Sequence, residues 1–126
     1  MIDVWVDGGY GSKGVSIGVV INEGPHRIYT LGVKEKMEGS NNVAEYLALN
    51  VSLAWLMKRG HHHKKITIRS DSKMLVQQIN GRMAARNGDY VEQYLKAREA
   101  VKQFNNLSVI WIPREENKEA DALTRV

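Results

Sequence analysis

The sequence of 126 residues has no cysteine, only two prolines and no long apolar run. The lack of cysteine excludes disulfides and cysteine-based zinc sites. No apolar segment approaches the roughly 20 residues that a transmembrane helix needs, and the first residues do not have the pattern of a signal peptide. We therefore expect a cytoplasmic protein with no membrane partner. Because no exposed apolar stripe is evident, we also expect a monomer.

The composition is typical of a globular protein. Hydrophobic residues make up 43% of the chain and charged residues 25%, which excludes a disordered tail or a fibre. A chain of this length buries roughly two-thirds of its surface on folding, so we expect residues 1–126 to form one domain. Eighteen basic residues outnumber 14 acidic ones, giving a net charge of +4. This mild excess is compatible with a nucleic-acid partner and equally with no such partner.

The hydrophobic pattern predicts a mixed α/β fold. Alternation with a period of two and β-branched residues predict strands at 1–7, 15–22, 26–34, 66–70 and 107–112, with a glycine-rich turn at 8–14. Helical spacing predicts helices at 43–59, 72–80, 89–104 and 116–125. The order is β-β-β-α-β-α-α-β-α. Because helices connect the later strands, these should run parallel to the first strand in a five-stranded mixed sheet with helices on its faces.

Four carboxylates fall where such a sheet places a ligand site. Asp7 is on the first strand, and Asp71 follows the fourth strand. The carboxyl ends of parallel strands lie at one edge of the sheet, so these two side chains should converge there. Glu45 is predicted in the first turn of the long helix, and Asp121 lies on the last helix, which begins near the same edge.

Each carboxylate also has a purely structural interpretation. Asp7 followed by two glycines is typical of a turn. Glu45 lies three residues after Asn42 and would complete a capping box. Asp71 would cap the helix that starts at Ser72, and Asp121 would face solvent. These interpretations and a catalytic one are not exclusive.

Four segments containing these carboxylates resemble the signature segments of the type 1 ribonuclease H family. They are Val6-Asp7-Gly8-Gly9, Ser40-Asn41-Asn42-Val43-Ala44-Glu45, Ser70-Asp71-Ser72 and the stretch from Pro113 to Leu123. Their order and spacing are similar to those of the family and span nearly the whole chain. The predicted order of elements also matches, so the resemblance implies a ribonuclease H-like fold, and the last segment is most similar to a compact archaeal-type and bacterial branch.

The resemblance implies an endonuclease that hydrolyses the RNA strand of an RNA/DNA hybrid. It makes Asp7, Glu45, Asp71 and Asp121 both the catalytic residues and the ligands of two Mg²⁺ or Mn²⁺ ions, which take oxygen ligands. The expected products carry 5′-phosphate and 3′-hydroxyl ends. It also implies substrate contacts, with amide side chains near the 2′-hydroxyls that distinguish RNA from DNA. The expected contact residues are Gly8, Gly9, Ser40, Asn41, Asn42, Ser72 and Arg114.

The chain departs from the family at two positions that bear on the mechanism. Arg114 stands in the loop where many members have a histidine, and arginine does not accept a proton. We expect Arg114 to contact phosphate instead. The basic protrusion of many relatives is reduced to the short segment 81–88, with two arginines.

Other functions of the same fold remain open from the sequence. One alternative is a non-catalytic module that binds the hybrid or double-stranded RNA, and another is a resolvase or exonuclease. Double-stranded RNA is also a candidate substrate. Four clustered carboxylates favour catalysis over simple binding, because they repel a phosphate backbone unless metal neutralises them.

Overall fold

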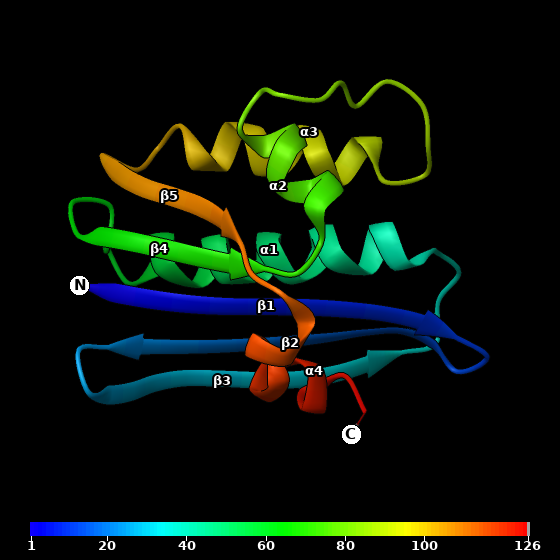
Figure 1. Ribbon diagram of the computed structural model, residues 1–126, viewed down its shortest axis with the longest axis horizontal. Helices are drawn as coiled ribbons and strands as arrows, with labels where there is room; N and C mark the ends of the chain where they lie inside the picture. Colours follow the sequence, from blue (N-terminus) through cyan, green and yellow to red (C-terminus); the bar gives the residue numbers. More distant parts are fainter. Residues whose placement is uncertain (126) are drawn as a thin grey trace.

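The computed structural model describes residues 1–125 and contains a five-stranded sheet in the order β3-β2-β1-β4-β5 (Figure 1). The predicted fold and the order of its elements are confirmed. The strands are β1 (Ile2–Gly11), β2 (Gly14–Glu23), β3 (His26–Glu35), β4 (Lys65–Ser70) and β5 (Asn106–Trp111). The helices are α1 (Asn41–Lys58), α2 (Lys73–Ile79), α3 (Val91–Val101), the 3-10 turn η1 (Arg114–Glu116) and α4 (Lys118–Leu123).

The first three strands form an antiparallel meander whose first hairpin differs from the prediction. The glycine-rich segment is strand as far as Gly11, and only Ser12 and Lys13 lie between the strands. Gly8 and Gly9 pair with Ile17 and Ser16. The predicted turn at 8–14 is wrong because these glycines adopt extended backbone, whereas Gly14 alone in this segment has a positive φ, of 99°.

The second half of the sheet is parallel, as predicted. β4 pairs in parallel with β1, and β5 pairs in parallel with β4. Helices α3 and α4 are shorter than the sequence predicts, because the chain before α4 forms η1 and the two ends of the predicted third helix are turns. No helix within residues 1–125 combines the length and the apolar character that crossing a membrane requires.

The two faces of the sheet are covered by different helices. Alternation along β1 turns Ile2, Val4 and Val6 to one side, where they form a fully buried core that also contains Leu49 and Leu53 of α1. Helix α4 lies on the opposite face, in front of the strands in Figure 1. Gly18 of β2 allows this approach, since a Cβ there would lie 2.1 Å from the Ala120 carbonyl oxygen.

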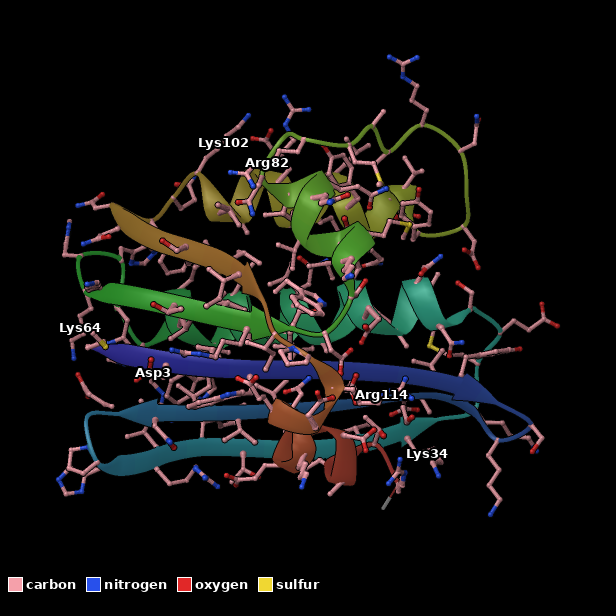
Figure 2. All side chains as sticks on the ribbon, in the orientation of Figure 1. Asp3, Lys34, Lys64, Arg82, Lys102 and Arg114 are labelled. Atoms are coloured by element: carbon pink, nitrogen blue, oxygen red, sulfur yellow. The ribbon has the colours of Figure 1, made fainter. Side chains whose placement is uncertain are left out.

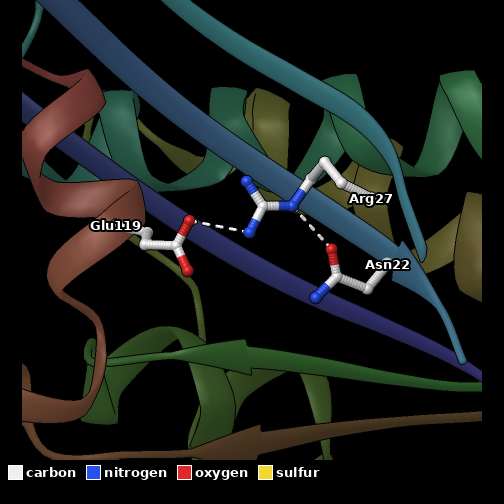
Figure 3. A network of polar contacts seen from close by, with 3 residues as sticks. All are labelled: Asn22, Arg27 and Glu119. Atoms are coloured by element: carbon white, nitrogen blue, oxygen red, sulfur yellow. Dashed lines mark hydrogen bonds and ion pairs between the residues drawn. The ribbon is translucent and has the colours of Figure 1, made fainter. Parts of the chain in front are cut away.

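Polar contacts link α4 to the sheet surface (Figure 3). Arg27 of β3 donates from its guanidinium to Glu119 of α4 at 2.7 Å and to Asn22 Oδ1 at 2.6 Å. Both charged side chains are substantially exposed, so the pair adds little stability by itself. The pair connects β3 to α4, which is the helix that carries Asp121.

Candidate active site

A cleft of about 360 Å³ lies where the carboxyl ends of β1 and β4 meet the first turns of α1 and the end of α4. It brings together every predicted site residue except Ser40. The residues lining it are Asp7, Gly8, Gly9, Asn41, Asn42, Glu45, Asp71, Ser72, Arg114, Asp121, Thr124 and Arg125. Segments from all four quarters of the chain therefore contribute to one concave site.

Three of the four carboxylates form a tight cluster. Asp7, Glu45 and Asp71 each offer an oxygen atom, and these atoms all lie within 4.8 Å of one another. Asp121 lies outside this group of three, but it is near enough to Asp7 to contribute to raising the pKa of that carboxyl. Asp121 is also paired with Arg125, whose guanidinium lies 2.9 Å from a carboxylate oxygen.

The electrostatics of the cluster favour protons or cations. Burial, followed by the charge of Asp71, raises the pKa of Asp7 to about 7. Burial, followed by the charges of Asp7 and Asp71, raises the pKa of Glu45 to about 9. Like charges brought together in a poorly solvated cleft cannot all ionise without a compensating positive charge. The cluster therefore has the chemistry of a site for a hard divalent cation.

Glu45 reaches the cluster because α1 lies directly against β1. At Gly8, a Cβ would lie 2.3 Å from the Ala44 carbonyl carbon and 2.5 Å from the Glu45 nitrogen. The backbone N–H of Gly8 donates to Glu45 Oε1 at 2.5 Å. The missing side chain of Gly8 therefore accommodates the helix, while Gly9 has only Ser16 Oγ near its Cβ position, at 3.2 Å.

Ser40 and Asn41 place the start of α1. The Ser40 hydroxyl accepts from the Val43 N–H at 3.2 Å and donates to Asp89, so it is the N-cap of α1 and lies outside the cleft. The expected capping box of Asn42 and Glu45 is wrong, and Glu45 falls beyond the first turn. Asn41 Oδ1 accepts from the Tyr10 N–H at 2.9 Å, which ties the helix to β1.

Asn42, Ser72 and Arg114 lie at the opening of the cleft. Asn42 and Arg114 are exposed, and Arg114 begins η1. The Ser72 hydroxyl accepts from the Leu75 N–H at 3.2 Å, so Ser72, not Asp71, caps α2. The carboxylate of Asp71 is thus not used by the helix and faces the cluster.

Asn117 is a buried residue of the site that the sequence pattern did not single out. Its side chain is 1% exposed and donates from Nδ2 to the Val6 carbonyl at 2.9 Å and to Asp71 Oδ2 at 3.2 Å. Its Oδ1 atom is buried and has no hydrogen-bond partner. A polar residue before a helix suggests a cap, but Asn117 makes no cap bond. Thr124 and Arg125 were also missed, although the spacing of Arg125 from Asp121 suits a helical ion pair.

The sheet order, the helix positions and the acidic cleft together define a ribonuclease H-like protein. A family model described as "Reverse transcriptase-like" matches residues 6–126. The chain belongs to this family and, within it, to the type 1 ribonucleases H, so the predicted family is confirmed.

Individual relatives agree with this assignment. Ribonuclease HI of Halobacterium salinarum is 31% identical over 108 residues, covering 86% of this chain and 53% of the relative. The crystal structure of RNase H1 from that archaeon has a TM-score of 0.87 at 28% identity, covering 98% of this chain and 94% of that one.

Two further relatives extend the comparison. LC11-RNase H1, isolated from compost and solved in complex with an RNA/DNA hybrid, has a TM-score of 0.87 at 30% identity, covering 99% of this chain and 94% of that one. The bifunctional protein Rv2228c of Mycobacterium tuberculosis is 34% identical over 84 residues, 67% of this chain. The chain spans about a fifth of that relative (22%) and about half of the Halobacterium ribonuclease HI.

Proposed function

We propose that this chain is a metal-dependent endonuclease that hydrolyses the RNA strand of RNA/DNA hybrids. The observation that carries the proposal is the cluster of Asp7, Glu45 and Asp71, whose oxygens lie within 4.8 Å of one another in an open cleft. The hybrid in the structure of LC11-RNase H1 supports this choice of substrate.

The residues present fit Mg²⁺ or Mn²⁺. The clustered carboxylates are hard oxygen ligands. Burial and then the charges of neighbouring carboxylates raise the pKa values of Asp7 and Glu45, which favours a bound cation. We assign Asp7, Glu45 and Asp71 as ligands, with Asp121 completing the set beside Asp7. Two bound ions would supply Lewis-acid activation of water and stabilisation of the leaving oxygen.

The protein's own residues position the reaction. Asn117 holds one oxygen of Asp71, and the Gly8 N–H holds one oxygen of Glu45, so both carboxylates are fixed in orientation beside the cleft. Water attacks the scissile phosphorus and the bond to the ribose 3′-oxygen breaks, leaving a 5′-phosphate and a 3′-hydroxyl. Arg114 contacts the phosphate as a fixed positive charge. None of the described lining residues is a histidine.

Recognition of the hybrid is assigned to the start of α1. Asn41 and Asn42 present exposed amides at the cleft, where they can reach base edges and 2′-hydroxyls. Gly9 has no Cβ and Ser72 has a small side chain, so both leave room for a nucleic-acid backbone. A purely binding module on the same fold is less consistent with the cluster, because three unneutralised carboxylates repel phosphate.

Three features of the whole protein remain predictions from the sequence. They are a single catalytic domain over residues 1–126, a monomeric state and a cytoplasmic location. Cleavage of double-stranded RNA also remains open to experiment.

The proposal is tested with a panel of end-labelled substrates. With Mg²⁺ or Mn²⁺, we expect cleavage of the RNA strand in a hybrid and no cleavage of single-stranded RNA or duplex DNA. Mapping of the product ends should show a 5′-phosphate and a 3′-hydroxyl. A ligase that needs these two ends should therefore join the products. Binding of the hybrid without cleavage by either metal would instead favour the binding module.

A further inference from the structure

A second cavity adjoins the catalytic cleft and contains no acidic residue. Its volume is about 420 Å³, and it shares Gly9, Thr124 and Arg125 with the cleft. The other residues that line it come from the β1–β2 hairpin and from β3: Tyr10, Gly11, Ser12, Lys13, Gly14, Ser16 and Lys34. We call it the basic pocket. Three cations from three separate segments of the chain, Lys13, Lys34 and Arg125, therefore line one cavity.

The sheet register places the basic pocket one row beyond the catalytic aspartate. Asp7 pairs with Gly18, which pairs with Gly32 on β3. The next row on the same face consists of Gly9, Ser16 and Lys34. Successive rows on one face are about 7 Å apart along the strands. Lys34 is thus on the face that carries Asp7 and α4, displaced by a distance of the order of one nucleotide step.

The two lysines are available for a ligand. Lys13 and Lys34 are exposed, and neither forms an ion pair with any of residues 1–125. Arg125 bridges the two cavities, because it pairs with Asp121 and also lines the basic pocket. Lys34 lies near the end of α4 in Figure 2, whereas Lys102 lies on the opposite side of the molecule.

From this arrangement we propose that the basic pocket binds a backbone phosphate of the cleaved RNA strand, within two nucleotides of the scissile phosphate. The inference rests on the proposed function, which puts the scissile phosphate at the carboxylates. Because the two cavities share lining residues, phosphates that occupy both belong to neighbouring nucleotides of one strand. Unpaired lysines and an arginine suit a phosphate, and contacts of this kind bind without reading base sequence.

The test measures hybrid binding by the full chain carrying Asp71→Asn, with and without Lys13→Ala and Lys34→Ala. We expect the slope of log affinity against log salt to fall by about 0.9 for each lost phosphate contact. The matched control is Lys65→Ala with Lys102→Ala, which removes the same charge at exposed positions. Lys65 begins β4 and so lies at the end of the strand away from the cleft. This control should lower the slope much less.

Neutral methylphosphonate linkages then locate the contact. Wild-type cleavage of the same hybrid first maps the scissile position. One neutral linkage in the RNA strand, within two nucleotides of that position, should weaken binding by the parent chain and have no further effect in the double lysine variant. A slope change no larger than in the control, or sensitivity only to DNA-strand linkages, would overturn the proposal while leaving hybrid cleavage intact. Absence of cleavage by the wild-type chain would instead reject the proposed function, and this inference with it.

Discussion

At the scale of single residues, the site depends on how its carboxylates are held as much as on their presence. Asn117 contributes two hydrogen bonds from one buried amide, to the backbone of β1 and to Asp71. The amide thus links the first strand, the end of the fourth strand and the start of the last helix. We class Asn117 as a positioning residue.

Replacing Asn117 with alanine should impair metal use more than substrate binding. Loss of a hydrogen bond to a metal ligand typically costs about 10- to 100-fold in metal affinity or activity. The Mg²⁺ concentration for half-maximal cleavage should rise accordingly, and KM for the hybrid should change little. The control is Asn80→Ala, which removes an amide bond to the Val109 carbonyl away from the cleft. If Asn117→Ala and Asn80→Ala needed the same Mg²⁺ concentration for half-maximal cleavage, Asn117 would have only a structural role.

The titration of Asp7 and Glu45 gives a pH prediction for the metal-free protein. Their pKa values of about 7 and about 9 lie above the ordinary 3.8 and 4.5, so the folded state binds more protons than the unfolded state. The stability that these groups contribute is fully present below about pH 4 and is lost as pH rises through 7 and 9. The loss should be of the order of several kcal/mol.

Thermal melts in a chelator from pH 5 to pH 9 check this prediction. The melting temperature of the wild-type chain should fall with pH, and added Mg²⁺ should raise it most at the alkaline end. Asp7→Asn combined with Glu45→Gln should flatten the profile. A wild-type profile as flat as that of the double variant would contradict the electrostatic account.

At the scale of elements, the packing of α1 on β1 delivers Glu45 to the other carboxylates. This contact depends on Gly8, where any side chain would meet the backbone of Ala44 and Glu45. Helix α4 also packs closely against a glycine, because Gly18 of β2 faces the Ala120 carbonyl. Two glycines thus set the positions of the two helices that carry Glu45 and Asp121.

Gly8→Ala should separate α1 from β1 and weaken both folding and catalysis. Overpacking of this kind typically costs about 1–3 kcal/mol, and cleavage should fall because Glu45 leaves the cluster. Chemical denaturation and single-turnover cleavage measure the two effects. For stability, the control is Gly11→Ala on the same strand, where a Cβ meets no atom within 4 Å. If Gly8→Ala were as stable as that control, the close packing of α1 on Gly8 would not be needed to position Glu45.

The elements themselves were largely predictable from the sequence. Period-two and helical patterns placed all five strands and four helices, and the parallel pairing of β4 with β1 followed from the connections. The ends were less predictable. Glycines in β1 look like a turn, since nothing in the pattern shows that α1 needs the space above Gly8. Likewise, the pattern around Asn117 looks like a helix start, and its bond to Asp71 depends on residues distant in sequence.

At the scale of the whole molecule, the residues other than the four carboxylates carry a net positive charge. Of 14 acidic residues, four are the candidate catalytic carboxylates, so ten acidic residues face 18 basic ones elsewhere, a net of +8. On the proposed function, this net positive charge should steer a phosphate backbone towards the protein, and bound metal would neutralise the carboxylates. Arg114, Lys13, Lys34 and Arg125 are the cations that line the cleft and the basic pocket.

Hybrid binding should therefore depend strongly on salt. If these four cations contact phosphate, affinity should fall roughly a hundredfold between 50 and 200 mM salt. A fluorescence anisotropy titration with a labelled hybrid measures this directly. An affinity that changes less than about threefold over the range would show that the cations do not bind the backbone.

The metal-dependent carboxylate site is tested most directly by cleavage of an end-labelled RNA/DNA hybrid by the wild-type chain and by Asp71→Asn, with Mg²⁺, with Mn²⁺ and with a chelator. The carboxylate cluster predicts cleavage of the RNA strand only by the wild-type chain and only with metal, while Asp71→Asn remains folded and inactive. Cleavage by Asp71→Asn at the wild-type rate, or cleavage in the chelator, would contradict a metal-dependent site built on these carboxylates.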